Sequence, residues 1–181
     1  MSSSGYDPLL LEKAKNIRLL ICDVDGVLSN GKVYYSNSGD EIKSFNIKDG
    51  LGIKQLLNND ISVAIITGRQ SEIVERRAKE LGIPFIYQGK KDKRESYKEI
   101  IGKLGIQPFQ VAHAGDDLPD LPLMQMSGLG ISMNDGHFFV KQNADWCTQL
   151  NGGDGAVREI ADMLLIAQQK LDAIHQGFLT Q

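Results

Sequence analysis

The chain has 181 residues, of which 41% are hydrophobic and 24% are charged, and its formal net charge is −3. These values predict one soluble globular domain spanning residues 1–181, and they exclude a disordered, collagen-like or coiled-coil chain. The lysines and arginines are scattered along an acidic chain, so nucleic acid is not expected as a partner.

Apolar periodicity and turn residues divide the chain into alternating helices and strands. In chain order, the pattern predicts a helix at 9–15, a strand at 17–22, a hairpin with strands at 32–35 and 41–45, a helix at 49–58, a strand at 63–66, a helix at 71–81, a strand at 84–87, a helix at 91–104, a strand at 110–114, a helix at 118–126, a strand at 128–131 and a helix at 156–173. Strands that alternate with helices imply an α/β fold with a three-layer, Rossmann-like parallel sheet.

Two features of the chain bear on its compartment. Cys22 and Cys147 stand singly in apolar surroundings, which is typical of small buried side chains in a reducing environment rather than of a disulfide. Residues 1–5 lack the basic and apolar regions of a secretion signal, and no apolar run approaches the roughly 20 residues of a membrane span. We therefore expect a cytoplasmic protein without a membrane partner.

Polar residues gather where the predicted strands end. Asp23 and Asp25 follow the first strand, Thr67 follows the strand at 63–66, Asp116 follows the strand at 110–114, and Lys93 lies near a helix start. In a parallel sheet, ligands bind at the carboxyl ends of the strands. A carboxylate cluster with a hydroxyl and a lysine is the set that metal-assisted phosphoryl transfer requires.

Each of these residues has a natural role in such a reaction. Asp23 is ionised at neutral pH and is a candidate nucleophile toward phosphorus. Asp25 is a candidate acid for the leaving alkoxide and then base for the attacking water. Mg²⁺ held by Asp23, Asp116 and a backbone carbonyl would offset the repulsion between carboxylate and phosphate. Lys93 and the Thr67 hydroxyl would bind the phosphate oxygens.

Structural interpretations compete with several of these roles. A pair of aspartates at a strand end is a common turn or helix cap, and Asp117 in particular is expected to cap the helix at Leu118. Lys93 stands in a run of charged residues that is typical of a solvated helix face. His113 is expected to be a buried histidine behind the site rather than a catalytic one.

The polar motifs, taken in their order along the chain, resemble those of a known superfamily. Asp23-Val24-Asp25-Gly26-Val27, Thr67-Gly68-Arg69, Lys93 and Gly115-Asp116-Asp117-Leu118-Pro119-Asp120 resemble the four motifs of the haloacid dehalogenase superfamily, in its phosphatase branch. Residues 45–50, 87–89 and 152–159 are similar to the family of 3-deoxy-D-manno-octulosonate 8-phosphate phosphatases. The resemblance extends from about residue 17 to the carboxyl end.

The resemblance implies the haloacid dehalogenase fold and a Mg²⁺-dependent cytoplasmic homotetramer that removes phosphate from an eight-carbon sugar acid made for lipopolysaccharide. By the same resemblance, Asp23, Asp25 and Asp116 hold the metal, and Asp23, Asp25, Thr67 and Lys93 are catalytic. The substrate contacts that it implies are Asp25, Asn46, Ile47, Lys48, Asp49, Gly50, Lys54, Arg69, Arg77 and Lys93.

Several basic residues are candidates for the substrate carboxylate, which needs its own cationic partner. They are Lys48, Lys54, Arg69 and Arg77. Alternatively, Arg77 pairs with Glu80 or Glu72 on a helix surface, and Lys54 is simply solvated.

Three other functions remain open at this point. Within the phosphatases, the substrate could be a nine-carbon, sialic acid-type sugar acid 9-phosphate. A phosphorylation-controlled receiver also uses clustered aspartates, a threonine and a lysine, but in a different order along the chain. A catalytically silent oligomerising domain of the same fold is disfavoured because all four motifs are retained.

The chain has no room for the cap domain of larger relatives. Only the hairpin within residues 31–46 separates the first two motifs, and an isolated hairpin is marginal in water. We expect the hairpins of several subunits to associate in a homotetramer and to supply substrate contacts, and residues 175–181 to reach an adjacent site.

Overall fold

The computed structural model describes residues 5–180. Its centre is a parallel sheet with the strand order β5-β4-β1-β6-β7-β8. The strands are β1 (Leu19–Cys22), β4 (Ser62–Ile66), β5 (Phe85–Tyr87), β6 (Val111–Gly115), β7 (Leu129–Ser132) and β8 (Trp146–Cys147). The predicted fold class is confirmed, and β8 is a short edge strand that the sequence analysis did not predict.

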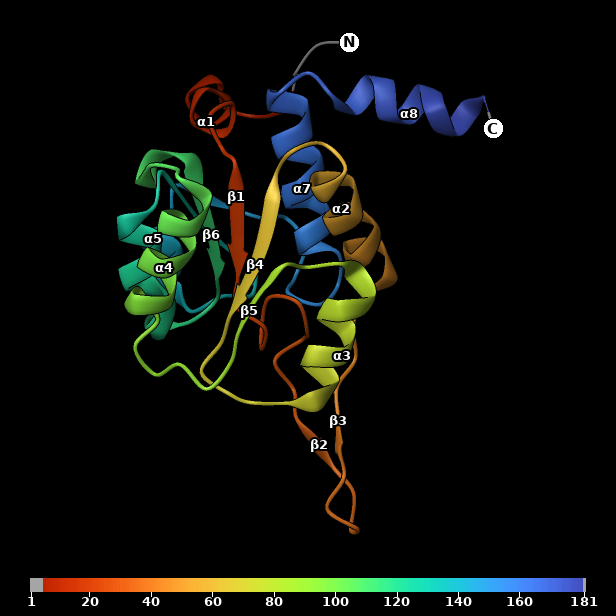
Figure 1. Cartoon of the computed structure of the whole chain (residues 1–181), viewed down its shortest axis with the longest axis vertical. Coiled ribbons are helices and arrows are strands. Elements are labelled where there is room, and N and C mark those ends of the chain that lie inside the picture. Colours follow the sequence, from red (N-terminus) through yellow and green to blue (C-terminus); the bar gives the residue numbers. More distant parts are fainter. Residues whose placement is uncertain (1–4, 181) are drawn as a thin grey trace.

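Helices cover both faces of the sheet (Figure 1). One layer contains α2 (Ile47–Leu57), α3 (Glu72–Leu81) and α7 (Ala156–Ala167), and the other contains α4 (Arg94–Leu104) and α5 (Leu121–Met126). The remaining helical segments are α1 (Pro8–Ala14), the 3₁₀ turns at Pro108–Gln110 and Leu118–Asp120, α6 (Phe138–Gln142) and α8 (Leu171–Leu179). Among the described residues, no helix has the length and apolar character needed to cross a bilayer.

Strand β1 is the middle of the core because it is buried on both faces. Leu20 and Cys22 pack into the cluster on the α2 and α7 side, and Leu19 and Ile21 pack into the cluster on the α4 and α5 side. Alternation of side chains along a strand sends successive residues to opposite faces. An uninterrupted apolar run therefore fits a central parallel strand, and the polar residues that follow it emerge at the edge of the sheet.

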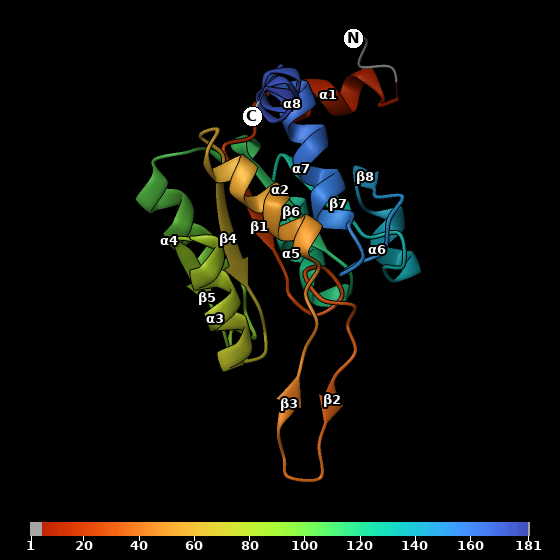
Figure 2. The same ribbon diagram turned by 90° about the vertical axis from the view of Figure 1, so that its right-hand side faces the viewer.

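The hairpin projects away from this body (Figure 2). Its strands, β2 (Tyr34–Tyr35) and β3 (Glu41–Ile42), are shorter than predicted and pair Tyr34 with Ile42 and Tyr35 with Glu41. The side chains of Tyr35 and Ile42 are 68% and 56% exposed. Within one subunit, the side chains of Tyr35 and Ile42 are therefore left uncovered.

The prediction of one helix at 156–173 is wrong. The chain breaks between α7 and α8, where Gln169 adopts a left-handed conformation with φ of 57°. The Lys170 Nζ atom donates to the carbonyl oxygen of Asn59 at 2.6 Å, and the Gln168 side chain donates to that of Ile17 at 2.8 Å. These contacts with distant segments favour the break, although the sequence has no glycine or proline there.

Candidate active site

A cavity of about 520 Å³ opens at the carboxyl ends of β1, β4 and β6. Its lining includes all five residues singled out at the strand ends, together with two unpredicted lysines from the segment between β5 and α4. The lining residues are Asp23, Asp25, Gly31, Thr67, Gly68, Arg69, Lys90, Lys91, Lys93, Asp116, Asp117, Pro119 and Asp120.

Lys93 joins two buried carboxylates at the floor of this cavity. Its Nζ atom lies 2.8 Å from Asp23 Oδ1 and 2.7 Å from Asp120 Oδ1. Although burial lowers the pKa of Lys93, the two carboxylates raise it above its usual value. Lys93 is therefore a buried cation beside Asp23, and its interpretation as part of a solvated face is wrong.

Asp120 is held by more partners than Lys93 alone. Its Oδ1 atom lies 3.2 Å from His113 Nε2, and its Oδ2 atom accepts a hydrogen bond from the Asp116 backbone N–H at 3.1 Å. Burial would raise the pKa of Asp120, but His113 and Lys93 lower it overall. His113 is fully buried behind the site, as expected. Asp120 lies within the fourth sequence motif, but the sequence alone predicted no role for it.

Three carboxylates meet in the cavity at the spacing of a metal site. Oxygen atoms of Asp23, Asp116 and Asp120 lie within 4.8 Å of one another. Burial and the neighbouring carboxylates Asp120, Asp23 and Asp117 raise the pKa of Asp116 to about 7. Burial, followed by Asp120, also raises the pKa of Asp23, while Lys93 opposes the shift. Crowded carboxylate oxygens fit a hard divalent cation such as Mg²⁺, which would relieve their repulsion.

The turn after β1 brings Asp116 close to the first motif. Gly26 has φ of +93°, a conformation that suits glycine. A Cβ atom at this position would overlap the Asp116 carboxylate. Glycine after Asp25 therefore lets the loops from β1 and β6 approach closely enough for their carboxylates to share one site.

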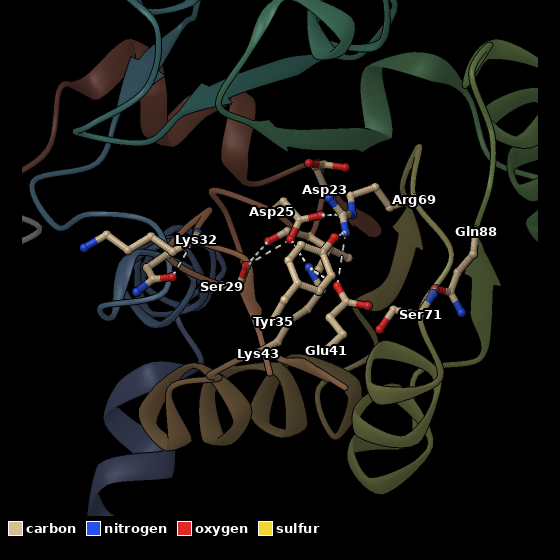
Figure 3. Close-up of polar contacts among 12 residues, drawn as sticks. Asp23, Asp25, Ser29, Lys32, Tyr35, Glu41, Lys43, Arg69, Ser71 and Gln88 are labelled. Atoms are coloured by element: carbon tan, nitrogen blue, oxygen red, sulfur yellow. Dashed lines mark hydrogen bonds and ion pairs between the residues drawn. The ribbon is translucent and has the colours of Figure 1, made fainter. Parts of the chain in front are cut away.

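Asp25 points to a different set of partners from those of Asp23 (Figure 3). Its carboxylate forms an ion pair with Lys43, and its Oδ2 atom lies 3.7 Å from Arg69 Nε. Arg69 also contacts Glu41 Oε1 at 3.2 Å and Tyr35 Oη at 3.1 Å. The Asp25 side chain is thus outside the group of three carboxylates, and residues of the hairpin surround it.

Loops from β4 and β5 form the basic side of the cavity. Thr67 is buried, and its carbonyl oxygen accepts from the Lys90 backbone N–H at 3.0 Å. The carbonyl oxygen of Arg69 accepts from Gly89 at 3.0 Å. These bonds place Lys90 and Lys91 at the rim, although their run of charges in the sequence gave no sign of a pocket.

The expected substrate contacts on α2 and α3 all lie outside this lining. Asn46 caps α2 by accepting from the Lys48 N–H at 2.8 Å, and Arg77 pairs with Glu80 at 3.5 Å. The surface pairing that competed with the role of Arg77 is thus present. The other expected contacts outside the lining are Ile47, Lys48, Asp49, Gly50 and Lys54. Their role toward substrate stays a prediction.

Asp49 has a structural task in this subunit. Its Oδ1 atom accepts from the Arg158 N–H at 2.8 Å, so it ties α2 to the start of α7. Its Oδ2 atom is buried without a hydrogen-bond partner among the described residues. Burial raises the pKa of Asp49 to about 6, against the opposing effect of backbone N–H groups.

Asp117 caps the turn at Leu118, as expected, by accepting from its N–H at 2.8 Å.

The fold and the site together define a class of protein. A parallel α/β sheet with a nucleophile candidate after β1, a buried lysine and late aspartates is the arrangement expected of haloacid dehalogenase-like hydrolases. A profile of that family matches residues 80–160, which include Lys93, Asp116 and Asp120. The order of these motifs decides against a receiver domain.

Two relatives are similar in sequence to nearly the whole chain. The chain is 50% identical over 170 residues to the 3-deoxy-D-manno-octulosonate 8-phosphate phosphatase of Yersinia pestis, covering 92% of this chain and 91% of the relative. It is likewise 50% identical to the enzyme of that name from Escherichia coli K12, covering 92% and 90%. The chain belongs to this family of haloacid dehalogenase-like phosphatases.

Solved structures agree with this assignment. The crystal structure of the Moraxella catarrhalis phosphatase of that name, in complex with magnesium, phosphate and 3-deoxy-D-manno-octulosonate, is 44% identical and matches with a TM-score of 0.93 over 96% of this chain and 99% of the other. The cobalt-bound phosphatase from Haemophilus influenzae is 41% identical, with a TM-score of 0.88 over 92% and 99%.

Proposed function

We propose that the chain is one catalytic domain that hydrolyses 3-deoxy-D-manno-octulosonate 8-phosphate to the free sugar acid and phosphate, in the synthesis of lipopolysaccharide precursors. The observation that carries this proposal is the buried Asp23–Lys93–Asp120 contact beside Asp116, in a chain that is 50% identical to phosphatases of that name. A silent oligomerising domain has no need of a lysine buried between two carboxylates, since taking these charges out of water costs free energy that their pairing often does not repay.

Asp23 is the nucleophile in this proposal. Its carboxylate oxygen forms a bond to phosphorus while the bond from phosphorus to the sugar oxygen breaks, which leaves an aspartyl-phosphate. Asp25 gives its proton to the departing alkoxide. In the second step, Asp25 takes a proton from water, the water oxygen bonds to phosphorus, and Asp23 is released. One residue thus serves as acid and then as base.

The cations of the site stabilise the phosphate through both steps. Lys93 and the Thr67 hydroxyl bind its oxygens, and Lys93 also orients Asp23. Asp23, Asp116 and a backbone carbonyl would hold Mg²⁺, because both oxygens of Asp120 already have partners in Lys93, His113 and the backbone N–H groups of residues 116 and 117. When bound, the ion supplies positive charge against the repulsion between carboxylate and phosphate.

The expected substrate contacts on α2 and α3 would act only in an assembly of several subunits. In a cytoplasmic homotetramer, exposed hairpins would pack together, and Asn46, Lys48, Lys54 and Arg77 would face the sugar acid bound to another subunit. Ile47, at 81% exposure, offers further apolar surface for such packing. Residues 175–180 extend along α8, away from the body, and would reach an adjacent cavity.

Replacing the nucleophile tests the proposed chemistry. We expect Asp23→Asn to lower kcat on the sugar acid phosphate by at least ~10³-fold, because a carboxamide cannot form the aspartyl-phosphate. Thermal unfolding checks that the variant is folded, and Asp92→Asn, at an exposed carboxylate outside the cavity lining, is the control with wild-type turnover. Substantial phosphatase activity in folded Asp23→Asn would remove Asp23 from this role.

A further inference from the structure

Lys43 is a buried cation that the proposed reaction does not use. It lies at the base of the hairpin, directly after β3, and its side chain has 0% exposure. Its ammonium group contacts the Asp25 carboxylate and lies 3.3 Å from Glu41 Oε1. Because burying an ammonium group is costly without a charged partner, these contacts fix where the side chain lies.

Glu41 links Lys43 to a second cation. The same Oε1 atom that faces Lys43 lies 3.2 Å from Arg69 Nη2, and that Nη2 atom is also 3.1 Å from Tyr35 Oη. Figure 3 shows these side chains converging on Asp25 from β2, β3 and the loop after β4. Two cations therefore flank Asp25, and residues of the hairpin hold both of them.

Residues next to Asp25 in the sequence do little to orient its carboxylate. Asp25 stands on a turn after β1, where it forms an isolated bridge with Ser29. The Ser29 hydroxyl lies 3.4 Å from Asp25 Oδ1, which is a long contact for a hydroxyl donor. The close partner of that oxygen is Lys43. The direction of the carboxylate thus depends on a side chain that is 18 residues away in the sequence.

We infer that Lys43 is a positioning residue, which holds the Asp25 carboxylate in the orientation needed for proton transfer to the leaving group and from water. This inference rests on the proposed function of Asp25. The hairpin then has a task inside its own subunit, in addition to any role in assembly, because its base aligns the proton-transferring group.

The test compares two substrates that differ in their need for a proton. A sugar alkoxide must be protonated as it leaves, whereas 4-nitrophenolate is a stable anion and leaves without help. We expect Lys43→Met to lower kcat on the sugar acid phosphate by ~10- to 100-fold, since general acid catalysis contributes ~10²- to 10⁴-fold. The loss of kcat on 4-nitrophenyl phosphate should be at least fivefold smaller if formation of the aspartyl-phosphate limits the rate. If its hydrolysis limits the rate, the loss of kcat is equal on both substrates, but a burst of 4-nitrophenol precedes the slow steady state.

Lys32→Met is the matched control. Lys32 lies on the same hairpin segment, is exposed, and points away from Asp25 (Figure 3), so less than a twofold change is expected. Lys43→Gln, which retains a polar end, replaces Lys43→Met in the same comparison if the latter does not fold. The loss of kcat on 4-nitrophenyl phosphate can be compared with the loss on any alkyl phosphate that the wild type accepts. If the natural substrate is a different one, the proposed function is overturned, but this test of Lys43 still applies.

Two results would overturn the inference. One is a change in kcat of less than twofold on both substrates. The other is an equal loss on both substrates without a burst, because a merely structural lysine lowers the fraction of active enzyme and thereby affects every substrate alike.

Discussion

Charged side chains at this site are stabilised by one another rather than by water. Lys93 lies between Asp23 and Asp120, and Lys43 lies between Asp25 and Glu41. In each group, a buried ammonium group faces two carboxylates. Removing one member of a buried pair leaves a charge without compensation, which is more costly than the pair itself is stabilising. The lysines therefore fix the orientation of the two catalytic aspartates in the proposed reaction.

Asp49, a buried carboxylate outside the cavity lining, predicts a pH dependence of stability. Its pKa is about 6 in the folded protein, against the usual 3.8 of an aspartate side chain in water. The folded state thus gains a proton before the unfolded state as pH falls. The protonated Asp49 carboxyl therefore favours the folded state. This contribution to the free energy of unfolding is fully present below about pH 4 and is lost as pH rises through about 6.

Asp49→Asn should remove this dependence. The amide oxygen can still accept from the Arg158 N–H, and no charge is buried at pH 7. We expect the free energy of unfolding to rise by roughly 1–3 kcal/mol at pH 7.5 and to change little at pH 3.5, as measured by urea denaturation at both values. An unchanged or lower stability at pH 7.5 would show that the buried Asp49 carboxylate is not a source of instability.

At the scale of elements, the sequence was most informative where local pattern and chemistry coincide. The strand before Asp23 is a continuous apolar run that ends on acid, and such a run in an α/β chain is expected to be a central strand. Its position then places Thr67 and Asp116 on the same edge of the sheet. This is why the cavity was predictable before its geometry was known.

Other elements depend on contacts that no local pattern reports. The bend at Gln169 is accompanied by contacts of Lys170 with Asn59 and of Gln168 with Ile17, which are distant in the sequence. Strand β8 has only two residues and exists because β7 offers it an edge. The ion pair of Lys43 with Asp25 likewise requires the hairpin to be in place, so the sequence alone gave Lys43 no role.

The hairpin is the element that should control assembly. Ile42 is 56% exposed on a strand that lies outside the main body. We expect wild-type protein to be a tetramer, four copies of 20.0 kDa or about 80 kDa, and Ile42→Glu to be smaller because it buries charge in the hairpin contact. Light scattering measures both masses, and Lys98→Glu on α4 is an exposed control. A wild-type monomer with full activity would contradict the proposed assembly.

At the scale of the whole molecule, the proposed reaction places its catalytic residues on loops from three neighbouring strands of a small α/β domain, and it places the residue that orients Asp25 on the hairpin. In the proposed reaction, groups from the loops after β1, β4 and β6 and from the start of α4 bind the phosphate. The sugar acid must be recognised by residues at the rim and, in the proposed assembly, by α2 and the tail of other subunits. Substrate preference is consequently the property that depends on the entire arrangement.

Relative kcat/KM on a panel of sugar phosphates tests this account most directly. The panel contains the eight-carbon sugar acid 8-phosphate, a nine-carbon sugar acid 9-phosphate and neutral sugar phosphates, each assayed with Mg²⁺ and with a chelator. We predict that 3-deoxy-D-manno-octulosonate 8-phosphate is preferred by at least ~10-fold over every other substrate and that the chelator abolishes turnover. Preference for the nine-carbon substrate, or equal turnover without a divalent cation, would contradict the account.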